Sequence, residues 1–190
     1  MGKRSDFARN PRDFYRTPAS ATLALLPHLK PGTQFAKPCA GDGLLIRHLE
    51  AAGHRCTFAG DIEPQAVGIV KQDAGAITRD NLGGARCIIT NPPWFRPDLH
   101  RLVRHWLGLG VPAWLLFDAS WPFTKQSTGL MQHCTDIQPV GRVQWIEGSA
   151  HQSLDDCSWY RFAPDHGTTV FHPRTTSDSA QSMLPMGGGS

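Results

Sequence analysis

The sequence predicts an α/β fold with a mainly parallel sheet, on two observations. Apolar runs with strand character alternate with segments of helical periodicity from residue 19 to Phe117. The runs 86–90 and 112–117 are apolar at nearly every position, as strands are when both of their faces are covered. Such alternation is typical of βα units, in which helices lie on both sides of a parallel sheet.

The first half of the chain is expected to contain a helix over 19–29, a strand over 34–38, a helix over 44–52, a strand over 55–60 and a helix over 64–70. Pro27 and Pro31 are expected to stop the first helix, because proline lacks the N–H that continues a helix. Gly53 lies where a glycine commonly follows the last turn of the second helix. Pro64 suits the first turn of the third.

The second half is expected to contain a strand over 86–90, a helix over 97–107 and strands over 112–117, 142–146 and 158–162. The helix is strongly amphipathic, since Leu99, Leu102, Val103 and Trp106 fall on one face. The last two strands are separated by a polar loop, which favours an antiparallel pair.

Length and composition indicate one globular domain. The chain has 190 residues, of which 40% are hydrophobic, and no apolar run reaches the ~18 residues of a membrane span. The basic N-terminus has no apolar stretch behind it, so a soluble, cytoplasmic protein that does not enter membranes is expected. Residues 1–12 are interpreted as a flexible basic arm, 13–163 as the folded domain, and the Pro/Ser/Thr/Gly-rich 164–190 as a disordered tail.

Neither disulfides nor a metal site are expected. The five cysteines are widely spaced and include no Cys-x-x-Cys, so buried reduced thiols are the simplest interpretation. His100 and His105 are five positions apart, which is not the i, i+4 spacing of a helical zinc site.

The distribution of charge says more than the net charge of +3. Residues 1–16 are basic, and a second basic stretch begins at Arg96 and includes Arg101 and Arg104. These three arginines are candidates for contact with a phosphate backbone. A solvated helix face is the alternative interpretation.

A glycine-containing turn, Pro38-Cys39-Ala40-Gly41-Asp42-Gly43, joins a predicted strand to a predicted helix. In open α/β sheets ligands bind beyond the carboxyl ends of the strands, where glycines let the backbone approach them closely. This turn is not the Gly-x-Gly-x-x-Gly of dinucleotide sites, because the next position in that register is Ile46. A plain connecting loop is about as good an interpretation of the turn alone.

Asp61 ends the second predicted strand, 18 residues after Gly43. A carboxylate there can accept hydrogen bonds from both hydroxyls of a ribose. The alternative is an aspartate that caps a helix beginning near Pro64.

Asn91-Pro92-Pro93-Trp94 follows the predicted strand 86–90 directly. Two prolines hold a rigid, extended turn, so the carboxamide oxygen of Asn91 and a proline carbonyl can together accept the two hydrogens of an amino group. That arrangement would leave the amine lone pair free to attack a methyl group. Trp94 offers a flat face for stacking, although a buried tryptophan after a Pro-Pro turn is the structural alternative.

With these motifs in this order, residues 13–163 resemble the class I S-adenosylmethionine-dependent amino-methyltransferases, whose best-known members methylate the 6-amino group of adenine in DNA. The resemblance rests on the Pro38–Gly43 turn, Asp61, Asp73, the Asn-Pro-Pro-Trp motif and the upstream segment 13–18. It implies a single-domain, Rossmann-like, doubly wound sheet of seven strands, mainly parallel with a reversed last strand.

The resemblance also assigns roles to particular residues. Tyr15, Thr17 and Pro18 would contact the methionine end of S-adenosylmethionine; Pro38, Cys39, Ala40, Gly41 and Gly43 would line the cofactor; Asp61 with Ile62 would hold its ribose; Asp73 with Ala74 would bind its adenine. Asn91 and Pro92 would bind the target amine, with Asn91 also touching the cofactor, Pro93 completing the catalytic loop and Trp94 stacking on the target ring.

Two departures from the family pattern bear on binding. Many members have an acidic residue before the glycine turn to bind the cofactor amine, whereas this chain has Lys37-Pro38. Either another group, such as Asp42, replaces that contact, or the cofactor binds more weakly. Sequence-selective members also carry a large target-recognition region, for which only the loops 119–141 and 147–157 are available here.

Methylation of adenine in DNA, with low sequence selectivity, is therefore the leading hypothesis. The same chemistry on structured RNA or on a protein glutamine amide is an alternative, although glutamine methyltransferases usually have Tyr in place of Trp94. A further alternative is a non-catalytic subunit of a heterodimer, and oligomerisation stays open.

Overall fold

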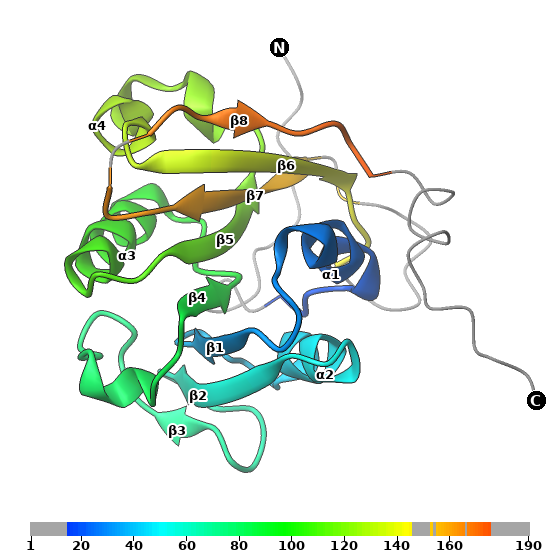
Figure 1. Ribbon diagram of the computed structural model, residues 1–190, viewed down its shortest axis with the longest axis vertical. Helices are drawn as coiled ribbons and strands as arrows, with labels where there is room; N and C mark the ends of the chain where they lie inside the picture. The colour runs from blue at the N-terminus through cyan, green and yellow to red at the C-terminus, as the bar shows by residue number, and fades with distance from the viewer. Residues whose placement is uncertain (1–14, 146–152, 154, 166, 176–190) are drawn as a thin grey trace, which may run out of the picture.

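The computed structural model describes residues 15–145, 153, 155–165 and 167–175. The whole predicted basic arm 1–12, most of the predicted loop 147–157, and residues 166 and 176–190 of the predicted tail therefore lie outside the described residues. The described chain forms one eight-stranded sheet in the order β3-β2-β1-β4-β5-β7-β6-β8, with helices on both sides (Figure 1). The predicted α/β class and the mainly parallel sheet are confirmed.

The helices are α1 (Ala19–Leu25), α2 (Leu44–Ala51), α3 (Arg96–Gly108) and α4 (Thr128–Met131), with short 3-10 helices at Leu26–His28, Asp80–Leu82, Trp121–Phe123 and Lys125–Ser127. The strands are β1 (Gln34–Lys37), β2 (Arg55–Asp61), β3 (Val70–Lys71), β4 (Cys87–Thr90), β5 (Ala113–Asp118), β6 (Cys134–Arg142), β7 (Asp156–Phe162) and β8 (Val170–Phe171).

The direction of the strands matches the predicted doubly wound arrangement. Strands β1 to β5 pair in parallel, and β7 runs antiparallel to both of its neighbours, β5 and β6. Strand β7 is thus the reversed seventh strand, and β8 is an eighth that pairs in parallel with β6. The strand order changes direction between β1 and β4, which is where ligands bind in sheets of this kind.

Two apolar cores lie on opposite faces of the sheet. Ile88 and Leu115 pack in the core with residues of α3 and α4, whereas their neighbours Ile89 and Leu116 pack in the core with residues of α1 and α2. Figure 1 shows α3 and α4 on one side of the sheet and α1 and α2 on the other. Because successive side chains of a strand point to opposite faces, strands covered on both sides need apolar residues at every position. This requirement explains the unbroken apolar runs in the sequence.

Two predicted elements are wrong. No helix forms over 64–70: the segment turns at Gly68, where φ is +86°, and then enters β3. Val67 is fully exposed there, so a helix would have had no core to cover. The strand predicted over 142–146 is instead β6, which ends at Arg142. Pro139 obscured this strand in the sequence, and the ladder accommodates it at a register shift between Pro139 and Gly141.

The predicted disordered tail contributes the short strand β8. Val170 pairs with Asp136 and Phe171 with Ile137 of β6. The His172 ring lies 2.9 Å from Asp136 Oδ1, which fixes the segment to the sheet by side-chain contact as well. Two residues with no amphipathic context are too few for periodicity to indicate a strand.

Candidate functional site

A cavity of about 950 Å³ opens where β1, β2 and β4 end. Its walls come from separate parts of the chain: the upstream Tyr15–Thr17, the turn after β1 with the start of α2, the regions after β2 and β3, the loop after β4, and α3. This volume falls at the upper end of the range for small-molecule and cofactor sites. The cavity lies at the point where the strand order reverses, as expected for this architecture.

The glycine turn is held in a conformation that requires glycine. Gly41 and Gly43 have φ of +59° and +78°, in the left-handed region that other residues rarely adopt. The Ala40 N–H donates to Gly60 O at 2.8 Å, and the Gly41 N–H donates to Asp61 Oδ2 at 2.7 Å. These bonds tie the turn after β1 to the end of β2, so the two sequence motifs form one wall.

Each carboxylate oxygen of Asp61 accepts one hydrogen bond and can accept another. Oδ2 accepts from Gly41 N, and Oδ1 accepts from the Glu63 N–H at 2.8 Å. A carboxylate offers about four acceptor sites, so two stay available to donors in the cavity. Asp73, which also lines the cavity, accepts from Gly75 N at 2.8 Å and is half-exposed. Asp61 thus stabilises the loop that follows it, although the helix that it was alternatively expected to cap is absent.

The Asn91 carboxamide is oriented from both ends. Its Nδ2 lies 3.4 Å from the Tyr15 carbonyl, and its Oδ1 accepts from the Trp94 indole N–H at 3.0 Å. The same indole N–H lies 3.2 Å from Leu116 O, and the ring packs edge-on against Trp145 at 5.5 Å. Oδ1 keeps one lone pair for another donor. In this arrangement Trp94 acts on Asn91 through its N–H.

The structure brings most of the predicted site residues together. Those that line the cavity are Tyr15, Thr17, Pro38, Cys39, Ala40, Gly41, Asp61, Ile62, Asp73, Ala74, Asn91, Pro93 and Arg101. Pro18, Gly43, Pro92, Trp94, Arg96 and Arg104 are not among the lining residues. Gly43 instead precedes α2 as its N-cap residue, and Pro92 is buried.

Sequence reasoning missed part of the lining. Glu63, Gln65, Phe95, Asp98 and Leu102 also face the cavity. Phe95 follows the Asn-Pro-Pro-Trp motif directly and is 54% exposed, so its position in the sequence was a usable signal. The contributions of Asp98 and Leu102 depend on how α3 is placed against the sheet, which local pattern does not reveal.

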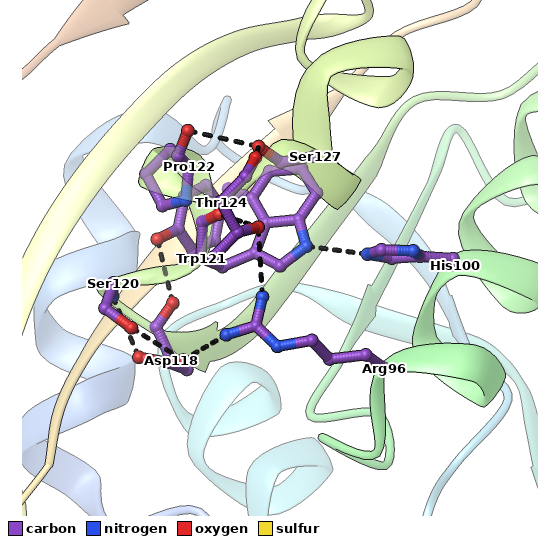
Figure 2. Close-up of polar contacts among 9 residues, drawn as sticks. Arg96, His100, Asp118, Ser120, Trp121, Pro122, Thr124 and Ser127 are labelled. Carbon is purple, nitrogen blue, oxygen red and sulfur yellow. Dashed lines mark hydrogen bonds and ion pairs between the residues drawn. The ribbon is translucent and has the colours of Figure 1, made fainter.

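The three arginines have different environments. Arg96 forms an ion pair with Asp118 at 3.1 Å and lies 3.2 Å from the Thr124 hydroxyl (Figure 2). It therefore fastens the loop after β5 to the start of α3. Arg101 lies 3.9 Å from both Asp73 and Asp98 at the rim of the cavity. Arg104 is exposed.

The loop after β5 has a second anchor. The Trp121 indole N–H donates to the His100 ring nitrogen at 2.9 Å (Figure 2). Trp121 is buried and packs against Phe117 and Tyr160. Burial is the main cause that lowers the pKa of His100, which favours the neutral ring that accepts this bond. Phe123, in the same loop, is exposed.

Asp42 is already committed to other partners. Arg16 lies 2.7 Å from its Oδ2, Arg47 lies 3.6 Å away, and the Leu44 N–H donates to its Oδ1 at 3.0 Å. Partial burial acts to raise the pKa of Asp42, but the Leu44 N–H and the Arg16 guanidinium outweigh it, so that the pKa is lowered. Asp42 is therefore poorly placed to replace the missing acidic residue.

Burial shifts the pKa of two side chains at the start of the glycine turn, Lys37 and Cys39. Burial lowers the pKa of Lys37, whose ammonium donates to the Cys39 carbonyl, and burial raises the pKa of the Cys39 thiol to about 12. The thiol stays protonated at neutral pH and is a weak nucleophile.

Among the described residues there is no cluster of metal ligands. No helix in the described part of the chain has the length and apolar character that a membrane span needs.

Comparison with known proteins supports the architecture. No protein-family model and no characterised protein sequence matches the chain. A protein from Pyrococcus horikoshii assigned as an RNA methyltransferase is similar in structure, with a TM-score of 0.54 and 14% identity over 82% of this chain and 90% of its own. The 23S rRNA methyltransferase ErmE has a TM-score of 0.52 and 13% identity over 89% of this chain and 75% of its own.

A third similar structure is the methyltransferase subunit of a type I restriction-modification system from Streptococcus thermophilus. It has a TM-score of 0.53 and 10% identity, and the match covers 89% of this chain but 52% of the subunit. At such low identity the likeness shows the fold. The chain has the Rossmann-like α/β fold that these methyltransferases share.

Proposed function

We propose that this protein is an S-adenosylmethionine-dependent methyltransferase that transfers a methyl group to the exocyclic amine of adenine in DNA, with low sequence selectivity. The observation that carries the proposal is that the glycine turn, Asp61, Asp73 and Asn91 line one cavity. A cofactor held by the first three would thus lie beside the fourth. The fold of the similar methyltransferases agrees with this.

The lining fits the cofactor chemically. The turn at Gly41 lets the backbone approach a ligand, and Asp61 has acceptor sites left for the two ribose hydroxyls. Asp73 can accept from the amino group of the cofactor adenine, and Ile62, 53% exposed, can cover the ring. Tyr15 and Thr17 would then face the methionine end, and S-adenosylmethionine would supply a methyl group on a positively charged sulfur.

Asn91 would position the target amine. Its free Oδ1 lone pair can accept one N–H of the amine. Pro92 is not among the lining residues, so acceptance of the second N–H by its carbonyl, which would draw the nitrogen out of conjugation with its ring, stays a prediction. The nitrogen lone pair would then attack the methyl carbon, the carbon–sulfur bond would break with its electrons on sulfur, and the amine would release one proton to water. Because Trp94 holds Oδ1 through its N–H, we infer that it orients Asn91; stacking of Trp94 on the base stays a prediction.

A nucleic-acid substrate would approach along α3. An adenine amine inside a duplex is out of reach, so the base must leave the stack at a cost of a few kcal/mol. Arg101 at the rim and Arg104 beyond it would contact phosphates, whereas Arg96 is paired with Asp118 and would act on the loop after β5. Phe95, exposed in the lining, is a second aromatic available to an extruded base.

Mass spectrometry of nucleosides and peptides tests the proposal and its alternatives in one experiment. Purified protein is incubated with unmodified DNA, structured RNA or cell extract and with S-adenosylmethionine that carries an isotopically labelled methyl group, and the digested nucleic acids and proteins are analysed. We expect the DNA to yield N6-methyl-2′-deoxyadenosine. Methylated RNA or labelled protein with unmodified DNA would contradict the DNA assignment but not the chemistry, and no product with any substrate would contradict the enzyme.

A further inference from the structure

Lys37 is a buried basic side chain in the wall of the cavity. It is the last residue of β1, it is 3% exposed, and it lines the same cavity as Asp42 and Asp61. Its ammonium donates to the Cys39 carbonyl, to which the Thr90 hydroxyl also donates at 3.2 Å. An ammonium has three N–H donors, and this carbonyl is the one acceptor that the described residues supply.

The nearby carboxylates do not neutralise this charge directly. Within the described chain no carboxylate oxygen lies within ion-pairing distance of Lys37. Asp61 accepts instead from Gly41 and Glu63, and Asp42 is paired with Arg16. A buried ammonium without a close anion is costly, which agrees with the lowered pKa of Lys37. The cavity therefore favours an anionic group within reach of Lys37.

S-adenosylmethionine has one anionic group, the α-carboxylate of its methionine end, while its α-ammonium and its sulfonium are positive. The ammonium would be repelled from Lys37, which stands where many related enzymes have an acidic residue. The carboxylate has the opposite preference, since its oxygens can accept the two remaining N–H groups.

We propose that Lys37 binds the α-carboxylate of the cofactor. In the family pattern an acidic residue binds the α-ammonium, so here the methionine end is held by its other charged group. This inference rests on the proposed function, because it assumes that S-adenosylmethionine occupies the cavity. Lys37 is then a specificity-determining residue: it selects a cofactor that carries an anion at this end, in a site without the usual acidic residue.

Binding calorimetry on the full chain tests this without measuring turnover. The ligands are S-adenosylhomocysteine and its analogue that lacks the α-carboxylate. We expect the chain to bind the first about 10- to 100-fold more tightly, which is the range for one hydrogen-bonded charge pair. Lys37→Met should bind the two ligands about equally, and Lys37→Glu should prefer the analogue, whose ammonium it would attract.

Lys30→Met provides the matched control, because Lys30 is exposed and lies outside the cavity lining. It should keep the discrimination of the unmodified chain. Thermal unfolding of each variant checks that it folds, and Lys37→Glu keeps the test valid if Lys37→Met is unstable. If a folded Lys37 variant preferred S-adenosylhomocysteine over the analogue as strongly as the unmodified chain does, the inference would be overturned and the proposed function would stay intact. Failure of the unmodified chain to bind either ligand would overturn both.

Discussion

The two halves of the sheet differ sharply in how well helices cover them; we call the half with β4 and β5 the β4–β5 side and the half with β2 and β3 the β2–β3 side. On the β4–β5 side, every residue of β4 and five of the six residues of β5 are buried between α3 and the helices of the other face. On the β2–β3 side, Gly60 is the single buried residue of β2, and both residues of β3 are exposed. The loop with Asn91 thus extends from the densely packed side, and Asp61 from the thinly covered one.

This difference suggests a division of roles. Asn91 is held by Tyr15 and Trp94 before any substrate arrives, as preorganised catalytic groups are. The β2–β3 side instead leaves Ile62, Val67 and Val70 exposed, because no helix covers residues 62–69. Substitutions on the β4–β5 side should therefore reduce stability or chemistry, and substitutions on the β2–β3 side should act mainly on ligand affinity.

The largest expected effect is on stability. Trp106 is fully buried in α3, and its indole N–H donates to Ala74 O at 3.1 Å. Trp106→Ala should lower the free energy of unfolding by about 3–5 kcal/mol, because a large cavity forms. Val67→Ala on the exposed side should change it by less than about 0.5 kcal/mol. Urea denaturation measures both, and similar losses would contradict the proposed difference between the two sides.

The next effect is on catalysis. Asn91→Ala should lower the rate of methyl transfer by about 10²–10³-fold, as the loss of one positioned polar group does in other enzymes. The affinity for S-adenosylhomocysteine should change little. Single-turnover assays and calorimetry separate the two quantities. Asn81→Ala, outside the cavity lining, is the control, and an equal loss of cofactor affinity in Asn91→Ala would refute the role assigned to Asn91.

Asp61→Asn should act on the cofactor. The amide keeps the shape of the side chain but loses the charge, and its NH2 group opposes an N–H of Gly41 or Glu63. We expect affinity for S-adenosylhomocysteine to fall by about 10-fold or more. Asp80→Asn, exposed on a 3-10 helix, is the matched control. Unchanged affinity in Asp61→Asn would remove the ribose assignment.

The affinity for S-adenosylhomocysteine should also depend on pH. Burial lowers the pKa of Lys37, while the nearby Cys39, Asp61, Cys56 and Asp42 act to raise it. A bound carboxylate stabilises the charged form, so affinity should be full below the pKa of Lys37 in the free protein and should decline as pH rises through it. The decline should begin below the range of an ordinary lysine. Calorimetry across this range should show it in the unmodified chain and not in Lys37→Met.

The smallest expected effect concerns DNA. Arg104→Ala should weaken DNA binding a few-fold at every sequence and reduce the slope of log affinity against log salt by about 1, because one phosphate contact is lost. Arg96→Ala should leave that slope nearly unchanged, since Arg96 is paired with Asp118. Fluorescence titrations at several salt concentrations distinguish them. The reverse pattern would mean that Arg96 leaves Asp118 to bind phosphate.

Sequence reasoning succeeded where a local pattern has one structural outcome. The alternation of apolar runs predicted the strands β1, β2, β4, β5 and β7, and the amphipathic spacing predicted α3 within a residue at each end. It failed where burial decides. The segment 64–70 has a plausible helix start at Pro64 but no core to cover, and β6 contains a proline that its neighbours accommodate.

The features of the cavity can likewise be separated into those that the sequence could predict and those that it could not. The glycine turn, Asp61, Asp73 and Asn91 could be predicted because each follows a strand, and the carboxyl ends of parallel strands meet at one edge of the sheet. The direction of each side chain could not. The hydrogen bond from Trp94 to Asn91 depends on the orientation of the Trp94 ring. The ion pair between Arg96 and Asp118 joins residues more than 20 positions apart in the sequence.

The sequence by itself determined the α/β class, the parallel core of the sheet and the motifs that meet at its edge, because periodicity and turn chemistry are local. The tertiary structure decided the rest. It left the β2–β3 side thinly covered, committed Asp42 to Arg16, and buried the Lys37 ammonium beside a single carbonyl. Burial and charge pairing depend on groups brought together from distant parts of the chain, so they emerge only when the chain has folded.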